Sequence, residues 1–323
     1  MSKTEKIKKA QKVMLSVGLV IVAILFLAPA FLDSFLIFLL TRILFMGLAA
    51  MSLFVLMGLG NMLSFAQMAF FGITAYGIGI TTTKLGWSFG AGVAFGLFLT
   101  VAFAAVFALI AIRTRGNYFL MITLALGQML YLAAQQWVEL TGGFSGTTAI
   151  PVWEFATSRN ALYYFILGIV LLIYIFLKRM ISSPFGVALQ GVRDDEKKMA
   201  ALGFNYQLIR YVAILLSSLL AGLAGMMSVL FYTMISPNTL VMTNSIALLF
   251  MCLIGGREKL EGAMLGSLIY LILQDVASQY TERYSIIIGG FFIIVVLFMP
   301  KGILGMKFRK FKNRKTTVQG ERV

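Results

Sequence analysis

The chain has 323 residues, of which 60% are hydrophobic and 12% are charged, and its formal net charge is +15. Soluble domains use roughly 45–50% apolar and about 25% charged residues, so this composition excludes an ordinary soluble domain. With no histidine and one cysteine, Cys252, the chain cannot form an internal disulfide, and zinc, haem and Cys/His nucleophile chemistry lack their usual ligands.

Long apolar runs between charged or turn-forming residues predict an all-α, polytopic bundle of eight to ten transmembrane helices. About 20 apolar residues are needed for a helix to cross the hydrocarbon core. The basic N-terminus leads into an apolar run without an evident cleavage site, so we expect a retained first helix rather than a signal peptide. The ten candidate spans lie near residues 13–32, 35–57, 62–83, 88–112, 117–136, 161–178, 210–232, 241–255, 262–279 and 285–300.

The distribution of basic residues predicts the orientation of the chain. Most of its 27 lysines and arginines fall in segments that a ten-span topology places on the side of both termini. By the positive-inside rule, that side is the cytoplasm. We therefore expect a basic cytoplasmic tail at 1–12, a transmembrane domain at 13–306 with a large cytoplasmic loop at 179–209, and a second basic cytoplasmic tail at 307–323.

The first polar interruption of the apolar sequence lies in a glycine-rich stretch, 58–77, which contains Asn61, Ser64, Gln67 and Thr74. Polar side chains in hydrocarbon are costly, so these four should face protein or a water-filled path. Helix packing and a translocation lining are equally good interpretations of this stretch alone. Glycine-rich, short or interrupted spans also suggest broken or re-entrant helices near 62–83 and 241–255, and a recurrence at 254–266 hints at an internal structural repeat.

A second polar stretch begins at 113–130, where two arginines mark the cytoplasmic boundary and Thr123 and Gln128 lie within the following span. It leads into a loop that we place outside the cell, containing Thr141, Gly142 and Gly143. Such a loop either contacts a solute or docking protein or is an ordinary surface loop.

The loop at 182–205 is the most charged segment between the termini. Ser183 followed by proline predicts a helix start, and Asp194 is expected to cap a second short helix that ends at Gly203. A short amphipathic helix between two spans has three interpretations: it lies on the lipid surface, it is a connector, or it inserts into a groove of a soluble partner.

Two further features bear on how transport would be driven. The sequence has no G-x-x-x-x-G-K-[ST] phosphate loop, so another chain must bind ATP if ATP is used, and we expect no enzymatic activity. Asp275 lies near the outer end of its span, where an acid is either a proton or ion site or simply reaches water; we favour the second. An ion-coupled secondary transporter therefore remains an alternative.

Four groups of motifs occur in order along the chain: LSFAQMAFFGITAYG; RTRGNYFLMITLALGQML followed by LTGGFSG; SPFGVALQGVRDDEKKMAALGFN; and LIGGREKLEGAMLGSLI with VLFMPKGILG. Together they resemble the inner-membrane permease subunits of bacterial branched-chain amino acid ABC importers, the LivM-like type. The resemblance runs from about 50 to 305, with 84–112 and 152–180 matching only as apolar helix.

The resemblance implies a cell-membrane importer with two permease subunits, two ATPase subunits that hold ATP and magnesium, and an external solute-binding protein. This chain itself would bind no cofactor or metal. The loop at 182–205 would be the coupling element that docks on the ATPase. Its expected contact residues are Arg193, Asp194, Asp195, Glu196, Ala200 and Gly203.

Some residues depart from the family's usual pattern. Ala66 and Gln67 stand where Gly-His is frequent, Gln128 stands where an acid is frequent, and the turn at 257–261 is more charged than usual. These departures leave the solute open among branched-chain amino acids, urea, short amides, nucleosides and sugars.

Overall fold

The computed structural model describes residues 22–281, 283–299 and 302–305. These residues form helices joined by short loops, with one isolated antiparallel bridge between Thr147 and Ile235. The predicted tails at 1–12 and 307–323 lie outside the described residues. The all-α architecture expected from the sequence is confirmed.

The long helices are α2 (Ser34–Phe54), α3 (Gln67–Thr83), α4 (Phe89–Ala111), α5 (Asn117–Gln136), α7 (Arg159–Ile181), α10 (Tyr206–Tyr232), α11 (Met242–Gly255), α12 (Leu260–Tyr280) and α13 (Tyr284–Phe298). Between them lie the π-helical turn η1 (Val55–Leu59), α6 (Val138–Thr141), η2 (Gly143–Ser145), η3 (Glu154–Thr157), α8 (Pro184–Asp194), α9 (Glu196–Ala201) and η4 (Pro237–Leu240), and η5 (Ile303–Gly305) follows α13.

Six of the ten expected spans are long and apolar enough to cross a membrane: Ser34–Leu59, α4, α5, α7, α10 and α12. The chain is therefore a multi-pass membrane protein. The other apolar helices among the described residues are shorter. α11, for example, has 14 residues and a length of about 21 Å, against a hydrocarbon core of about 30 Å.

The expected break near the third span is present. α2 ends in the π-helical turn η1, residues 61–66 are not helical, and α3 begins only at Gln67. Asn61 adopts a left-handed backbone with φ of 51°. Irregular backbone leaves amide and carbonyl groups outside the helical hydrogen-bond pattern, so this segment needs partners from protein or water.

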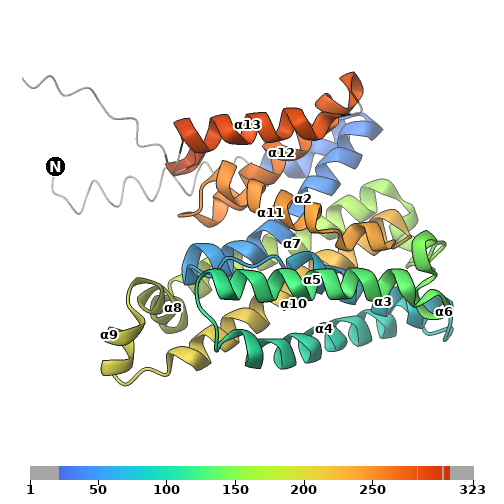
Figure 1. Ribbon diagram of the computed structural model, residues 1–323. Helices are drawn as coiled ribbons and strands as arrows, with labels where there is room; N and C mark the ends of the chain where they lie inside the picture. The colour runs from blue at the N-terminus through green and yellow to red at the C-terminus, as the bar shows by residue number, and fades with distance from the viewer. Residues whose placement is uncertain (1–21, 282, 300–301, 306–323) are drawn as a thin grey trace, which may run out of the picture.

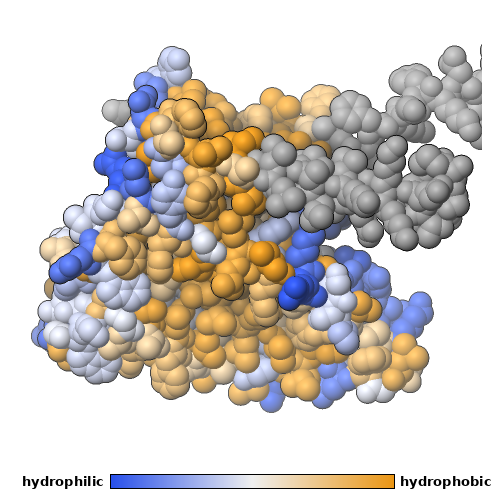
Figure 2. Space-filling model, turned by 180° about the vertical axis from the view of Figure 1, so that it is seen from behind, coloured by the Kyte–Doolittle hydropathy of each residue, from blue (hydrophilic) through white to orange (hydrophobic). Residues whose placement is uncertain are grey.

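α2 and α10 form the centre of the bundle and are the most buried of the six long spans, whereas α4 and α5 are the least buried (Figure 1). Small residues allow close helix contact in the core. A Cβ atom on Gly77 of α3 would lie 2.8 Å from Cα of Gly96 on α4. Hydrophobic side chains cover the middle of the face in Figure 2, with hydrophilic residues toward its ends.

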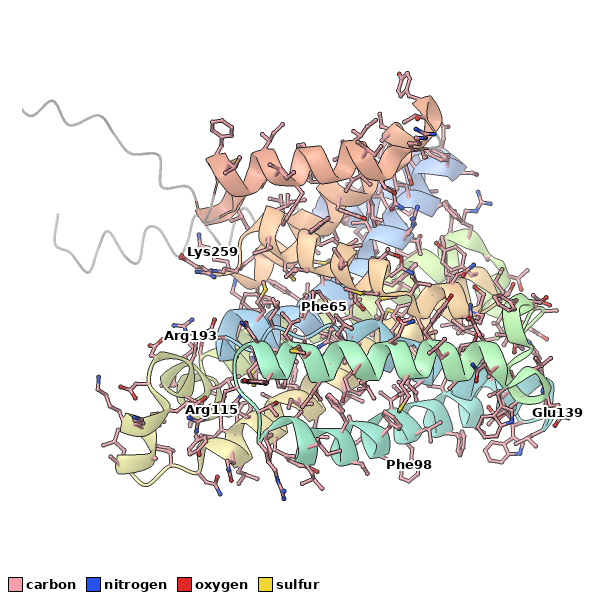
Figure 3. All side chains as sticks on the ribbon, in the orientation of Figure 1. Phe65, Phe98, Arg115, Glu139, Arg193 and Lys259 are labelled. Carbon is pink, nitrogen blue, oxygen red and sulfur yellow. The ribbon has the colours of Figure 1, made fainter. Side chains whose placement is uncertain are left out.

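The loops gather at two opposite ends of the bundle. α8 and α9 lie at one end and α6 at the other in Figure 1. Arg115, Arg193 and Lys259 lie at the end of α8 and α9 in Figure 3, and Glu139 lies at the far end. Basic residues from three separate connections between spans therefore share one end. The positive-inside rule predicts such clustering on the cytoplasmic side.

Candidate functional site

The charged segment 182–205 folds into the two helices α8 and α9. The Ser183 hydroxyl accepts a hydrogen bond from the Gly186 amide at 3.4 Å, and proline occupies the first turn of α8, as the sequence predicts. Gly186, Leu189 and Val192 are buried, so one face of α8 packs on the bundle.

The prediction that Asp194 caps the second helix was wrong. α8 continues through Asp194, and the next residue, Asp195, has the extended backbone of a cap. The Asp195 carboxylate accepts hydrogen bonds from the amides of Lys197 and Lys198 at 3.0 and 3.1 Å. The bond from the Lys198 amide is the main reason why the pKa of Asp195 lies below its usual value. The sequence pattern alone did not show which of the adjacent residues Asp194 and Asp195 caps the second helix.

Arg193 attaches the end of α8 to the bundle. Its guanidinium donates to the Gly58 carbonyl oxygen in η1 at 3.1 Å and forms an ion pair with Asp194 at 2.9 Å. A π-helical turn has irregular backbone bonding. Arg193 thus connects the charged segment to the turn that begins the break before α3.

The Glu196 side chain faces the bundle and is 25% exposed. Its two carboxylate oxygens form ion pairs with Arg210 at 3.0 Å and with Arg115 at 3.1 Å. Arg210 is only 4% exposed and also donates to the Thr114 carbonyl oxygen at 3.1 Å. The sequence analysis used Arg115 only to mark the cytoplasmic boundary and did not single out Arg210, although an arginine early in the apolar α10 was a usable signal.

The outer surface of the segment carries both charged and apolar side chains. Among the expected contact residues, Arg193, Asp194, Ala200 and Gly203 are exposed, and Asp195 and Glu196 are partly buried. Four large hydrophobic side chains are exposed around them; they are Val187, Leu202, Phe204 and Leu208.

Gln67 lies in a buried polar network at the helix crossing of α2, α3 and α10. Its side-chain amide donates to the Ser217 hydroxyl at 3.1 Å, and its oxygen accepts from the Ser52 hydroxyl at 3.1 Å. The Ser217 hydroxyl donates in turn to the Ser52 carbonyl oxygen at 2.5 Å. All three side chains are buried, so within this chain they join helices.

Other polar residues of the predicted path have local partners. The hydroxyl groups of Thr74 and Thr100 lie 2.6 Å apart and join α3 to α4. The Thr123 hydroxyl on α5 accepts from the Phe65 amide at 3.1 Å, and the Ser64 hydroxyl accepts from the Ala66 amide at 3.2 Å. These bonds satisfy the backbone of the break before α3.

Two predicted path residues are instead exposed: Asn61 in the break and Gln128 on α5. Thr141, Gly142 and Gly143 lie elsewhere, near α6 at the opposite end of the bundle from α8 and α9. The Thr141 hydroxyl donates to the Ala134 carbonyl oxygen at 2.6 Å, and both glycines have positive φ values. The structure therefore places the path residues in the buried contacts of α3, in the break before α3 and along α5, and in the loop beside α6.

Asp275 does not simply reach water. It forms an ion pair with Arg42 at 2.9 Å, and Arg42 also donates to the Gln274 side-chain oxygen at 3.2 Å. This cluster joins α12 to α2. A paired carboxylate satisfies its charge inside the chain.

Comparisons with known proteins identify the family of the chain. The family model described as "Branched-chain amino acid transport system / permease component" matches residues 35–297. The high-affinity branched-chain amino acid transport system permease protein LivM of Escherichia coli K12 is 22% identical over 294 residues, covering 83% of this chain and 69% of the relative. The corresponding protein LivH of the same organism is 29% identical over 200 residues, covering 56% of this chain and 62% of the relative.

A probable branched-chain amino acid transport permease protein LivM of Methanocaldococcus jannaschii is 23% identical over 221 residues, covering 63% of this chain and 64% of the relative. No solved structure matches the chain significantly. The family model covers most of the described helices, from the start of α2 to the end of α13. The chain therefore belongs to the family of permease components of branched-chain amino acid transport systems.

Proposed function

We propose that this chain is the transmembrane permease subunit of an ATP-driven importer that moves branched-chain amino acids or similar small solutes into the cell. The observation that carries the proposal is the α8–α9 segment, which lies at one end of the bundle and exposes both charged and apolar side chains. The chain has no phosphate loop of its own, so a partner must bind ATP and magnesium. ATP binding there would bias the permease between two conformations by binding them differently.

We assign docking of the partner ATPase to the exposed surface of α8 and α9. Asp194, Ala200 and Gly203 would contact the ATPase, together with the exposed hydrophobic side chains Leu202 and Phe204. Arg193, Asp195 and Glu196 have partners within this chain, and these contacts hold the segment in shape. In this proposal α8, α9 and both termini lie in the cytoplasm.

We place the translocation path beside α5, between this chain and a second permease. α4 and α5 are both weakly buried, but the exposed large side chains of α4 are all apolar and suit lipid. The exposed face of α5 carries Gln128, and the non-helical break with Asn61 lies against the same helix through the bond between Phe65 and Thr123. Lipid would leave these polar groups unsatisfied, whereas water or a second permease would not.

The loop with Thr141, Gly142 and Gly143 lies at the opposite end of the bundle, where it would meet the external solute-binding protein. Phe144 beside it is 78% exposed. The similarity of this chain to both LivM and LivH proteins supports a pair of related permeases.

The proposal is tested by reconstituting the complete importer in liposomes and measuring uptake of radiolabelled L-leucine. We expect accumulation only with ATP and the ATPase present. Uptake by the chain alone that collapses with a protonophore would instead establish ion-coupled transport. ATP-dependent uptake of urea, an amide, a nucleoside or a sugar, but not leucine, would support ATP-driven import and change the assigned solute.

A further inference from the structure

The helix α9 is attached to the bundle in an unusual way. None of its six residues is buried, so it has no packed apolar face of its own on the spans. α8, in contrast, has a buried face and the bond from Arg193 to Gly58. The chain between the two helices is the single extended residue Asp195. α9 therefore packs on α8, where Met199 meets Gly191, but has no buried face on the spans.

The ion pairs of Glu196 attach α9 to two spans. One carboxylate oxygen meets Arg210 near the start of α10, and the other meets Arg115 just before α5. Arg115 also donates to the Tyr206 hydroxyl at 3.2 Å, and its guanidinium lies 5.5 Å from the centre of that ring. One carboxylate thus joins the consecutive helices α9 and α10 to Arg115, which is distant in sequence.

The two ion pairs differ in environment. Arg210 is 4% exposed, and removal of its partner would leave a buried charge unpaired, which is strongly unfavourable. Arg115 is 58% exposed and faces a buried Glu196 oxygen that forms no hydrogen bond within the described part of the chain, so this pair depends on charge attraction alone. If the pair opens, the Arg115 guanidinium reaches water and Glu196 keeps its pair with Arg210. The pair with Arg210 is therefore held, and the pair with Arg115 is the weaker of the two.

The spans on the two sides also differ. α10 is the most buried of the six long spans and α5 is the least. A displacement of α9 would therefore meet more resistance at α10 than at α5. α5 bears Thr123, which holds the break before α3, and the exposed Gln128.

We propose that Glu196 is a positioning residue that transmits movement of α9 to α5 through a releasable ion pair with Arg115, while its pair with Arg210 holds α9 on α10. This inference rests on the proposed function, because the force on α9 would come from the docked ATPase. Glu196 would then act toward the permease and not as an ATPase contact.

The test is a double-mutant cycle in the complete importer, with Glu196→Gln, Arg115→Gln and both together. The measured quantity is the number of L-leucine molecules imported per ATP hydrolysed in liposomes. We expect each single variant to lower this ratio by fivefold or more while hydrolysis continues, and the double variant to be no worse than the lower single one. Non-additivity is the signature of a shared interaction.

Two further variants serve as controls. Arg115→Lys keeps the positive charge and should recover at least half of the wild-type ratio. Arg113→Gln removes an exposed charge two residues from Arg115, outside the docking surface, and should leave the ratio unchanged. A wild-type ratio in Arg115→Gln, or a proportional loss of transport and hydrolysis, would overturn the inference.

A second measurement covers the case in which Glu196→Gln does not fold. Spin labels at Lys197→Cys on α9 and Tyr118→Cys on α5 report the distance between the two helices, and native Cys252 is buried and will not take the label. Arg115→Gln should broaden this distance distribution. An unchanged distribution would contradict the proposed role of the ion pair between Glu196 and Arg115. Failure of the wild-type importer to take up leucine with ATP would instead contradict the proposed function.

Discussion

At the scale of single residues, hydrogen bonding determines what each polar side chain does inside the bundle. Gln67 and Gln128 are the same residue type within apolar helices, but Gln67 has partners on two other helices and Gln128 is exposed. Asp195 and Glu196 are adjacent acids, and one caps a helix whereas the other binds two arginines. The surroundings of each side chain, and not its residue type, determine its role within these pairs.

Replacing Gln67 with leucine should destabilise the subunit modestly. Ser52 keeps the Ala49 carbonyl oxygen as an acceptor and Ser217 keeps the Ser52 carbonyl oxygen, so no hydroxyl is left without a partner. Interhelical hydrogen bonds in membranes average about 0.6 kcal/mol, so we expect a loss of about 1 kcal/mol in detergent unfolding. The matched variant Gln128→Leu should leave stability unchanged but lower leucine uptake. Equal effects of both variants on stability would contradict the assigned places.

Asp195 should make the order of α9 depend on pH only in acid. Its pKa in the folded chain lies below the ordinary value of 3.8, so the carboxylate is a full acceptor above that pH and loses its capping bonds as pH falls through the lowered pKa. Hydrogen exchange at residues 197–201 should therefore be protected equally from pH 5 to 8 and lose protection below about pH 4. Asn is also a good cap but does not titrate, so Asp195→Asn should abolish this pH dependence.

At the scale of helices, close packing depends on glycine where two backbones meet. A Cβ atom on Gly225 of α10 would overlap the Phe71 carbonyl group of α3, while a Cβ atom on Gly168 of α7 would have no atom within 4 Å. Both glycines lie within spans of comparable length. The sequence shows that small residues are present but not which of them support a contact.

Gly225→Val and Gly168→Val therefore form a matched pair. Overpacking costs about 1–3 kcal/mol, so Gly225→Val should lower the stability of the subunit by that amount and separate α10 from α3. Gly168→Val should leave stability within about 0.5 kcal/mol of the wild type. Thermal unfolding in one detergent would measure the stability of both variants. A destabilised Gly168 variant would contradict the open space that the structure shows beside this glycine.

At the scale of the whole molecule, polar loops lie at the two ends of an apolar bundle, and the ends differ chemically. One end carries α8, α9 and the arginines of the Glu196 cluster, and the other carries α6 and η2 (Figures 1 and 3). A membrane protein with this asymmetry has a defined orientation. Orientation decides which partner each end can meet.

Cysteine labelling should establish that orientation. Lys197→Cys on α9 should react with a membrane-impermeant maleimide in inverted vesicles but not in intact cells, and Phe144→Cys in η2 should do the reverse. Both positions are exposed, and native Cys252 is buried, so the background is low. The opposite labelling pattern would place α8 and α9 outside the cell and remove the proposed ATPase contact.

Much of the architecture follows from the sequence. Spans at 35–57, 88–112, 117–136, 161–178, 210–232 and 262–279 are confirmed, because an apolar run must form a helix to satisfy its backbone in lipid. Ser183, Gly203 and the break before α3 were also predictable, since caps and helix breaks depend on neighbouring residues. The internal repeat remains a prediction.

The sequence by itself determined the membrane class, the order of the helices and the family, because these depend on local hydrophobicity and on motifs that are continuous in the chain. Only the tertiary structure decided which polar residues are buried, that Asp275 pairs with Arg42, and that Glu196 turns inward. Arg115, Glu196 and Arg210 meet only after three helices have packed, so no spacing along the sequence encodes their contact. Charge and hydrogen bonding act over a few ångströms in space, and folding alone sets those distances.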